Sequence, residues 1–378
     1  MEQYHQLLKE ILGRGDVQFE PRTQEHILGK SGAMSTYDTR VGFPLMTTKN
    51  VPPRLPFEEV FWKLRGERSV LSLINQNIHI WTKNAYGKYL EEIGLAEKIP
   101  KHSNIWHRGF EDYKTRLLTE PEMVGNGDLG PVYGYQWRHW HDPNGEEIDQ
   151  LEMLIKGIRS VPGSRYHTLS AWNVANLPNV ASGREEMALG PCPFWHQFSV
   201  WANGYMDLAM GQRSCDVFLG VPFNIAQDAL LLHMIANETG YKPRNLTTQL
   251  FNAHAYLGVP PRSDFWMESN NVEEFQKKFR EVAESKSKDL TKYLDLREWY
   301  LKTAPSESEG NEGKDHVPFI LMQLSKMPKP LPRLEIKSGV PLLDAIEMPA
   351  IQTEKEMGYA EILGYNPEKW NSKADMAA

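Results

Sequence analysis

The sequence predicts an α/β (α+β) fold in which a large mixed β-sheet is layered with helices. Residues 194–210 alternate apolar and polar side chains on either side of Asn203-Gly204, which is typical of a β-hairpin. Residues 222–240 are apolar on nearly every side and end in glycine, which predicts a buried helix. Because strand patterns and helix patterns are interspersed, we expect one layered domain that spans residues 1–378.

Two other helices are predicted near the start of the chain. Residues 1–14 form an amphipathic pattern, because the apolar side chains recur at helical spacing. Residues 56–66 show a similar pattern and carry the acidic pair Glu58 and Glu59 among apolar neighbours, with Gly66 as the predicted end of the helix.

Two polar stretches interrupt the apolar pattern, and we interpret them as insertions. The first, about 86–125, looks irregular or mobile. The second, about 263–325, contains a charged helical pattern at 270–287 and a polar tract at 306–314. Such a tract is typical of an exposed or disordered loop.

Composition limits the possible functions. The 378 residues carry a formal net charge of −7 and no basic stripe, which argues against a DNA-binding protein. An acidic protein that binds an anionic small molecule must place a few arginines locally. Only two cysteines occur, which argues against a disulfide framework and is typical of a reducing compartment. The twelve histidines show no zinc-ligand spacing, so we expect no metal site.

No segment approaches the ~18 apolar residues that span a bilayer. Residues 1–15 are charged and lack the apolar centre of a signal peptide. We therefore expect no membrane association and a cytoplasmic location, which would be the host cytoplasm if the protein is viral.

Cys192 lies between Pro191 and Pro193, just before the first strand of the predicted hairpin. Proline on both sides excludes a helix and stiffens the backbone, which is a good setting for aiming a nucleophilic thiol. The alternative is a buried structural thiol, which is the commoner role of a lone cysteine.

Three other groups of residues have side chains that suit a nucleotide. Arg213 and Ser214 offer a fork of donors and a hydroxyl to a phosphate, although a surface ion pair explains them equally well. Asn224 begins the buried helix, either as a cap or as a reader of a pyrimidine edge. His254 and Tyr256 are two residues apart, so in a strand they face the same side.

Several blocks carry a family resemblance. They are residues 42–49, 126–134, 170–174, 212–224 and 330–332. The fourth block, Gln-Arg-Ser-Cys-Asp-Val-Phe-Leu-Gly-Val-Pro-Phe-Asn, is very specific. On these blocks the chain resembles thymidylate synthase and its relatives, the pyrimidine nucleotide hydroxymethylases. With their surroundings the blocks cover most of the chain outside the two insertions.

The resemblance implies a homodimer and a role for each matching residue. Cys192 would add to C6 of the pyrimidine, while Glu59, supported by Tyr133, would handle protons around C4 and C5. Asn224 and Arg213 would assist the catalysis. The residues implied for deoxyuridylate are Arg22, Arg165 of the partner subunit, Gln212, Arg213, Ser214, Asp216, Asn224, His254 and Tyr256. Those implied for the co-substrate 5,10-methylenetetrahydrofolate are Lys49, Trp81, Asp216, Gly220 and Phe223.

The chain departs from the family pattern after the nucleophile, beside the partner arginine, after Trp81, before His254 and at the C-terminus. These places hold Pro193, Tyr166, Thr82 and Asn84, Phe251-Asn252-Ala253, and Asp375-Met376-Ala377-Ala378. The nucleotide side is thus mostly intact, whereas the folate side and the closing tail are altered.

These departures bear on the product. A synthase must exclude water while hydride reaches the exocyclic methylene, whereas a hydroxymethylase must let water add to it. The sequence therefore predicts a deoxyuridylate 5-hydroxymethyltransferase of phage type, acting through a Cys192 adduct. The alternatives are a divergent thymidylate synthase that forms dihydrofolate, or an inactive relative that binds nucleotide or RNA. Asn224 favours uracil, because relatives that act on cytosine tend to have aspartate there.

Overall fold

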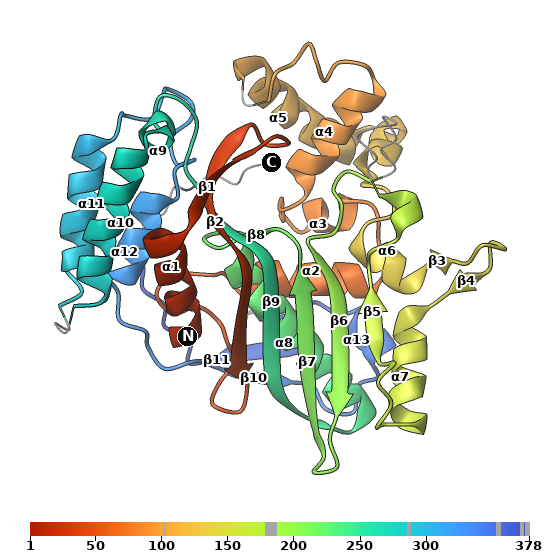
Figure 1. The fold of residues 1–378 in the computed structure, drawn as a ribbon. Helices are drawn as coiled ribbons and strands as arrows, with labels where there is room; N and C mark the ends of the chain where they lie inside the picture. The colour runs from red at the N-terminus through yellow and green to blue at the C-terminus, as the bar shows by residue number, and fades with distance from the viewer. Residues whose placement is uncertain (102, 178–186, 286–288, 353–356, 371–373, 375–378) are drawn as a thin grey trace.

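A seven-stranded mixed sheet forms the centre of the computed structural model (Figure 1). The structure describes residues 1–101, 103–177, 187–285, 289–352, 357–370 and 374. The strand order is β1-β2-β9-β7-β6-β5, and β8 pairs with β9. β7 and β8 run parallel to β9, and the other neighbours are antiparallel. The strands are β1 Asp16–Glu20, β2 Glu25–Asp38, β5 Thr168–Ser170, β6 Pro193–Val200, β7 Tyr205–Gln212, β8 Cys215–Asp216 and β9 Lys242–Tyr256. The predicted fold class is confirmed.

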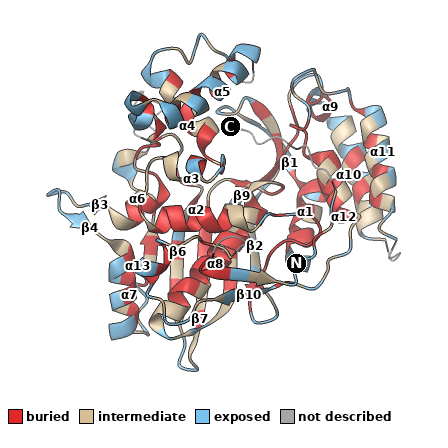
Figure 2. Cartoon of the chain, turned by 180° about the vertical axis from the view of Figure 1, so that it is seen from behind, coloured by how far each residue is buried: buried red, intermediate tan, exposed pale blue. Residues whose placement is uncertain are grey.

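Helix α8 (Gly220–Thr239) packs against β7 and β9, and α2 (Arg54–Leu64) packs against α8. Both helices are buried along most of their length (Figure 2). α8 ends at Gly240, whose φ of 80° is left-handed and whose N–H bonds back to Ala236. Both predicted helices are confirmed, and each begins two residues earlier than its pattern indicated.

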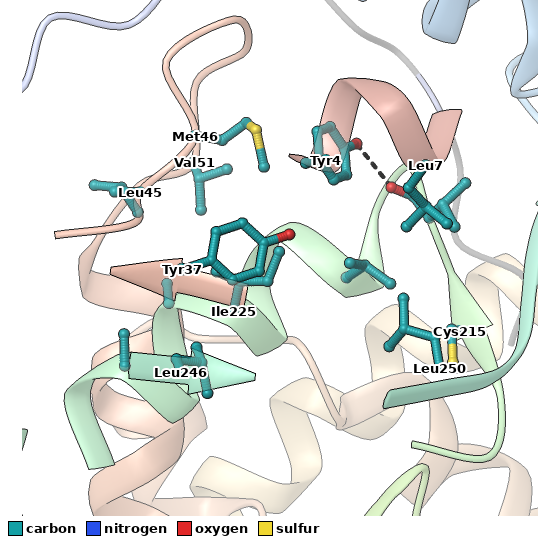
Figure 3. Packing of buried hydrophobic residues seen from close by; sticks show 14 of the residues in the cluster. Tyr4, Leu7, Tyr37, Leu45, Met46, Val51, Cys215, Ile225, Leu246 and Leu250 are labelled. Carbon is teal, nitrogen blue, oxygen red and sulfur yellow. Dashed lines mark hydrogen bonds between the residues drawn. The ribbon is translucent and has the colours of Figure 1, made fainter. Parts of the chain in front are cut away.

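The main hydrophobic core joins α1 (Glu2–Arg14) to α8 and the sheet (Figure 3). The hydroxyl of Tyr4 donates to the carbonyl of Val217 at 2.7 Å, which fixes α1 to the start of α8. Cys215 and Leu250, from two paired strands, belong to the same core and are almost fully buried. The amphipathic helix predicted at 1–14 is therefore confirmed, and its apolar face closes the core.

The predicted hairpin is formed by β6 and β7, with Trp201 to Gly204 between them. The N–H of Trp201 bonds to the carbonyl of Tyr205 at 2.9 Å, and Gly204 adopts a φ of 80°. Since β6 begins at Pro193, the hairpin places Cys192 where the strand starts.

The first insertion is helical, so the prediction of an irregular stretch at 86–125 was wrong. It contains most of α4 (Thr82–Glu92), α5 (Asn104–Thr119) and the 3₁₀ helix η1 (Pro121–Gly127). Aromatic residues hold it together: Trp106 stacks on Phe110 at 5.3 Å between ring centroids, and Tyr86 packs against both. These rings, together with Trp81 and Tyr133, form a second hydrophobic cluster. Many charged residues lie between these aromatic positions, so the sequence pattern did not indicate helices with a shared aromatic face.

The second insertion packs on α1 and extends the main core. Its helices are α9 (Asp264–Met267), α10 (Ser269–Ala283), α11 (Lys292–Thr303) and α12 (Val317–Leu324). The predicted helix at 270–287 corresponds to α10. The polar tract at 306–314 is a loop, as predicted, although Lys314 is buried.

The other elements are short. They are α3 Leu71–Asn75, α6 Tyr133–Arg138, α7 Gln150–Ser160, α13 Leu342–Ala345, η2 Val174–Asn176, and the paired strands β3 Trp140–His141 with β4 Glu147–Ile148 and β10 Arg333–Ile336 with β11 Ala360–Leu363. Among the residues that the structure describes, no helix has the length and apolar character needed to cross a membrane.

Candidate active site

The two cysteines occupy opposite environments. Cys215 is fully buried, and its thiol faces the carbonyl of Gln212. Burial raises the pKa of the Cys215 thiol, so it stays protonated and unreactive. Cys192 is partly exposed. Its N–H donates to the Tyr133 hydroxyl at 2.9 Å, and its carbonyl accepts from the N–H of Arg213 at 2.9 Å. The backbone of Cys192 is thus held from both sides, while its side chain remains accessible.

Tyr133 begins α6 in a strained conformation, with a φ of 31°. The next residue must be glycine, because a Cβ on Gly134 would lie 1.9 Å from the carbonyl oxygen of Lys63. This close approach of α6 to α2 carries the Tyr133 ring into the site. Burial, and then the nearby charges of Cys192 and Glu59, raise the pKa of Tyr133 well above its usual value. It is therefore a neutral phenol that can donate a proton in a hydrogen bond.

Glu59 lies on α2 and is 8% exposed. Its carboxylate accepts from the indole N–H of Trp81 at 3.2 Å and from the side-chain amide of Gln227. The Lys63 ammonium lies 2.9 Å from the same carboxylate. The Trp81 and Tyr133 rings are 5.4 Å apart. The predicted acid–base residue Glu59, its predicted support Tyr133 and the predicted folate residue Trp81 therefore share one cluster. Sequence reasoning missed Lys63 and Gln227, although a lysine and a glutamine inside apolar helices were a signal.

Two of the three arginines predicted for the phosphate, Arg22 and Arg213, line one cavity of about 420 Å³. Arg22 comes from the turn between β1 and β2, and Arg213 comes from the end of β7. The Arg213 guanidinium donates to the carbonyls of Gly190 and Pro191 at 2.6 and 2.9 Å, directly before the nucleophile. The wall also includes Asn84 and three lysines, Lys83, Lys88 and Lys101. An acidic protein thus concentrates cationic side chains beside Cys192, as an anionic substrate requires.

Asn224 lies within the first turns of α8 and does not cap it, because the cap position is Leu219. Its side-chain oxygen accepts from the Gln212 amide at 3.1 Å, and the same amide donates to the carbonyl of Ser214 at 2.9 Å. A Cβ on Gly220 would meet Asn224 at 3.7 Å, so the glycine leaves room beside the amide. The capping alternative is therefore wrong, and the Asn224 amide is oriented by Gln212.

Asp216 shapes the turn into α8. One of its carboxylate oxygens accepts from the N–H groups of Phe218 and Leu219 at 2.9 and 3.1 Å. Burial works to raise the pKa of Asp216, but the neighbouring His316 and His254 outweigh burial and lower it to about 2. Asp216 is therefore a carboxylate at any working pH.

His254 and Tyr256 face the same side of β9, as their spacing predicts, with ring centroids 5.2 Å apart. Nδ1 of His254 contacts the side-chain oxygen of Asn252 at 2.8 Å. Burial lowers the pKa of His254, which keeps the imidazole neutral near pH 7. The two rings can therefore act as neutral hydrogen-bonding groups.

Some predicted residues lie apart from this cluster. The Lys49 ammonium is buried, donates to the carbonyl of Phe218 at 2.5 Å and lies over its ring, and burial lowers the pKa of Lys49 to about 8. Phe223 is partly buried against the main core. Arg165 and Tyr166 are exposed on the loop before β5 and do not line the cavity with Arg213.

Three buried polar atoms near the start of α8 have no hydrogen-bond partner among the described residues: Oε1 of Gln212, Oδ2 of Asp216 and Nε2 of His254. Buried polar groups are normally satisfied, so these atoms are suited to bonds with a ligand. In the part of the chain that the structure describes, no group of three histidine, cysteine, aspartate or glutamate side chains could hold a metal ion.

Comparison with known proteins places this geometry in a family. A sequence model of the thymidylate synthase family matches residues 2–377. The thymidylate synthase of Listeria monocytogenes serotype 4a is 39% identical over 269 residues, which cover 68% of this chain and 82% of that protein. The thymidylate synthase of Mesoplasma florum is 40% identical over 258 residues, with the same coverage. The chain therefore belongs to the thymidylate synthase family.

Proposed function

We propose that this protein transfers a one-carbon unit from 5,10-methylenetetrahydrofolate to C5 of deoxyuridylate and releases thymidylate and dihydrofolate. The observation that carries the proposal is the position of Cys192. Its backbone is fixed by Tyr133 and Arg213, and Tyr133 shares a cluster with Glu59. The curated relatives named thymidylate synthase favour thymidylate over the hydroxymethyl product. We keep deoxyuridylate as the substrate, the homodimer and the cytoplasmic location as predictions.

The residues present can divide the chemistry among them. The Cys192 thiolate forms a bond to C6, and the C5–C6 π electrons move toward C5 and O4 as an enolate. Donors near Asn224 stabilise the charge on O4. C5 then becomes a nucleophile, and the folate supplies the methylene carbon and the hydride that reduces it. Glu59 takes the C5 proton through water, and release of Cys192 restores the ring.

A second candidate is addition of water in place of hydride, which gives 5-hydroxymethyldeoxyuridylate and tetrahydrofolate. One observation favours it: Asn84, where the family has an indole, lines the cationic cavity beside the nucleophile. A polar wall admits water more readily than an apolar one. The tail at 375–378, which the sequence also linked to this outcome, lies outside the described residues. An inactive nucleotide or RNA binder is disfavoured, because the predicted catalytic groups lie together in one site.

One experiment separates these functions. The protein is incubated with deoxyuridylate and 5,10-methylenetetrahydrofolate, while dihydrofolate is followed by absorbance and the nucleotide by mass. Thymidylate with stoichiometric dihydrofolate supports the proposal. 5-Hydroxymethyldeoxyuridylate without dihydrofolate supports the second candidate. If neither product forms and no covalent adduct with Cys192 is detected, both are wrong and the inactive binder remains.

A further inference from the structure

Behind the carboxylate of Glu59 lies a buried group of polar side chains that the reaction scheme does not yet use. Glu59 and Lys63 are four residues apart on α2, so both face α8, where Gln227 meets them. Lys63 and Gln227 are each 4% exposed. They are surrounded by apolar residues of α2 and α8, where an aliphatic side chain would satisfy packing.

The three side chains form a closed ring of contacts. The Lys63 ammonium lies 2.9 Å from Oε1 of Glu59 and donates to the Gln227 side-chain oxygen at 2.8 Å. The amide of Gln227 donates to Oε2 of Glu59, and the Trp81 indole donates to Oε1. Both carboxylate oxygens are therefore occupied by donors from fixed helices. A carboxylate restrained in this way cannot rotate away from the site.

The Lys63 ammonium also lies 4.7 Å from the centroid of the Tyr133 ring. One buried cation thus contacts both the predicted acid–base residue and the phenol that holds the backbone of Cys192. Burying an ammonium costs several kcal/mol, and an ion pair seldom repays that cost better than apolar packing does. A contribution to stability therefore explains poorly why Lys63 is buried at this place.

We propose that Lys63 and Gln227 are positioning residues, which hold the Glu59 carboxylate oriented to receive the C5 proton. The inference rests on the proposed one-carbon transfer. In that step the C5–H bond breaks, its electrons re-form the enolate, and the proton passes through water to Glu59. Lys63 balances the negative charge of the ionised carboxylate, and Gln227 fixes its plane. Neither residue touches the substrate.

Three other ionisable side chains lie next to this group. Tyr133 packs from α6, and a buried pair, His196 on β6 and Asp228 on α8, joins Nε2 to Oδ1 at 2.9 Å. Lys63, Gln227 and the His196–Asp228 pair line one small enclosed pocket. Glu59 does not line this pocket. We therefore infer that Lys63, and not the His196–Asp228 pair, pairs with the Glu59 carboxylate.

The test uses the full-length protein and three substitutions: Lys63→Met, which keeps the stem and removes the charge, Lys63→Arg, which keeps the charge, and Gln227→Leu. The matched control is Gln323→Leu, because Gln323 is a buried glutamine that bonds Thr48 and Tyr4, away from the site. For each variant, kcat, KM for deoxyuridylate and release of deuterium from C5-deuterated deoxyuridylate are measured, together with Tm.

We expect Lys63→Met and Gln227→Leu to lower kcat and deuterium release together by roughly 10- to 100-fold, which is part of the roughly 10²- to 10⁴-fold that general acid–base catalysis supplies. KM should change less than about threefold, because binding is untouched. Lys63→Arg should recover part of kcat.

Three outcomes overturn the proposal. One is a folded Lys63→Met protein with wild-type kcat and a wild-type rate of deuterium release. Another is a loss of activity that Gln323→Leu matches, which would show a general packing effect. If Lys63→Met does not fold, the proposal is tested with Gln227→Leu and Lys63→Arg instead. The third outcome that overturns it is a wild-type kcat in Gln227→Leu, which would show that Gln227 does not position Glu59. Failure of the proposed function itself is distinct, because the unmodified protein would then give either no turnover or 5-hydroxymethyldeoxyuridylate without dihydrofolate.

Discussion

Cys192 and Cys215 show how the local environment decides the chemistry of a side chain. Both lie within the residues that the family model matches, yet Cys192 is partly exposed and Cys215 is buried in the core. The flanking prolines predicted a rigid setting for Cys192 but could not exclude a structural thiol, because burial depends on distant strands. Lys63 and Gln227 were missed for a related reason: they meet across 164 residues of sequence. A local sequence pattern can suggest the role of a residue type, whereas a contact between residues this far apart can be found only when the fold is known.

The first prediction compares the two thiols. Cys192→Ala should abolish product formation and C5 hydrogen exchange with water, because no other accessible thiol is present, while deoxyuridylate still binds. Cys215→Ala is the control, and it should keep activity and lose about 1 kcal/mol of stability from the small cavity it leaves. Mass analysis of exchanged nucleotide and a thermal unfolding curve measure both. Exchange at a comparable rate in Cys192→Ala would exclude the covalent mechanism.

At the scale of elements, the predictable features were those whose signal lies within one segment. The hairpin at Asn203-Gly204 and the buried helix α8 have complete local signatures of turn, periodicity and end. The first predicted insertion has no complete local signature, because α5 presents its aromatic face to α4 and η1 and its charged side chains to solvent. The relative position of α2 and α6 could not be predicted from the sequence either, because it depends on a backbone contact at Gly134.

The second prediction concerns that contact. Gly134→Ala should force α6 away from α2, because the new methyl group would collide with a backbone carbonyl that cannot rotate aside. We expect a loss of about 1–3 kcal/mol in stability and a fall in kcat, because Tyr133 would move with the helix. Gly125→Ala is the control, since a Cβ there meets nothing within 4 Å. Urea unfolding and steady-state kinetics on both variants test this, and equal stability of the two would refute the packing argument.

The third prediction is a pH dependence of stability set by the second insertion. Burial raises the pKa of Asp315 to about 7, although Arg262, 3.4 Å away, and the Tyr300 hydroxyl oppose the rise. In the unfolded chain an aspartate ionises near pH ~4. The protonated carboxyl therefore stabilises the fold fully below that pH, and the contribution is lost as pH rises to 7, by at most ~1.4 kcal/mol per pH unit.

Replacing Asp315 by asparagine should flatten the stability profile between pH 4.5 and 7, whatever its effect on absolute stability. Asp295→Asn, at an exposed position on α11, serves as the control and should keep the slope of the unmodified protein. Chemical denaturation at a series of pH values gives the comparison. An unchanged slope in Asp315→Asn would show that this carboxyl does not titrate in the predicted window.

At the scale of the whole molecule, the outer face of the sheet carries apolar side chains that the chain leaves exposed. Trp195 and Phe251 lie on either side of Gly211, and they are 40% and 45% exposed. An apolar patch on a sheet face is a common mark of an interface. It supports the predicted homodimer, as does Arg165, which lies exposed and apart from the cavity that the other phosphate arginines share. Whether a second subunit completes the site depends on assembly, which is why Arg165 stays a prediction from the resemblance.

The last prediction tests whether Arg165 acts across that interface. Arg165→Ala and Cys192→Ala subunits are each expected to have little activity, the first through weak phosphate binding and the second through loss of the nucleophile. If Arg165 serves the partner's site, a mixed dimer contains one complete site, with Cys192 from one subunit and Arg165 from the other. Mixing the two variants under conditions that exchange subunits should then restore activity, up to one working site per mixed dimer.

If Arg165 instead serves its own subunit, each site in the mixed dimer lacks one group and mixing restores nothing. The control pairs Cys192→Ala with Glu59→Gln, two residues of the same site, which should not complement in either case. Light scattering before and after mixing confirms the dimer on which the experiment depends. A fully active monomer in dilute solution would contradict the trans arrangement outright, because the phosphate would then be held without a partner subunit.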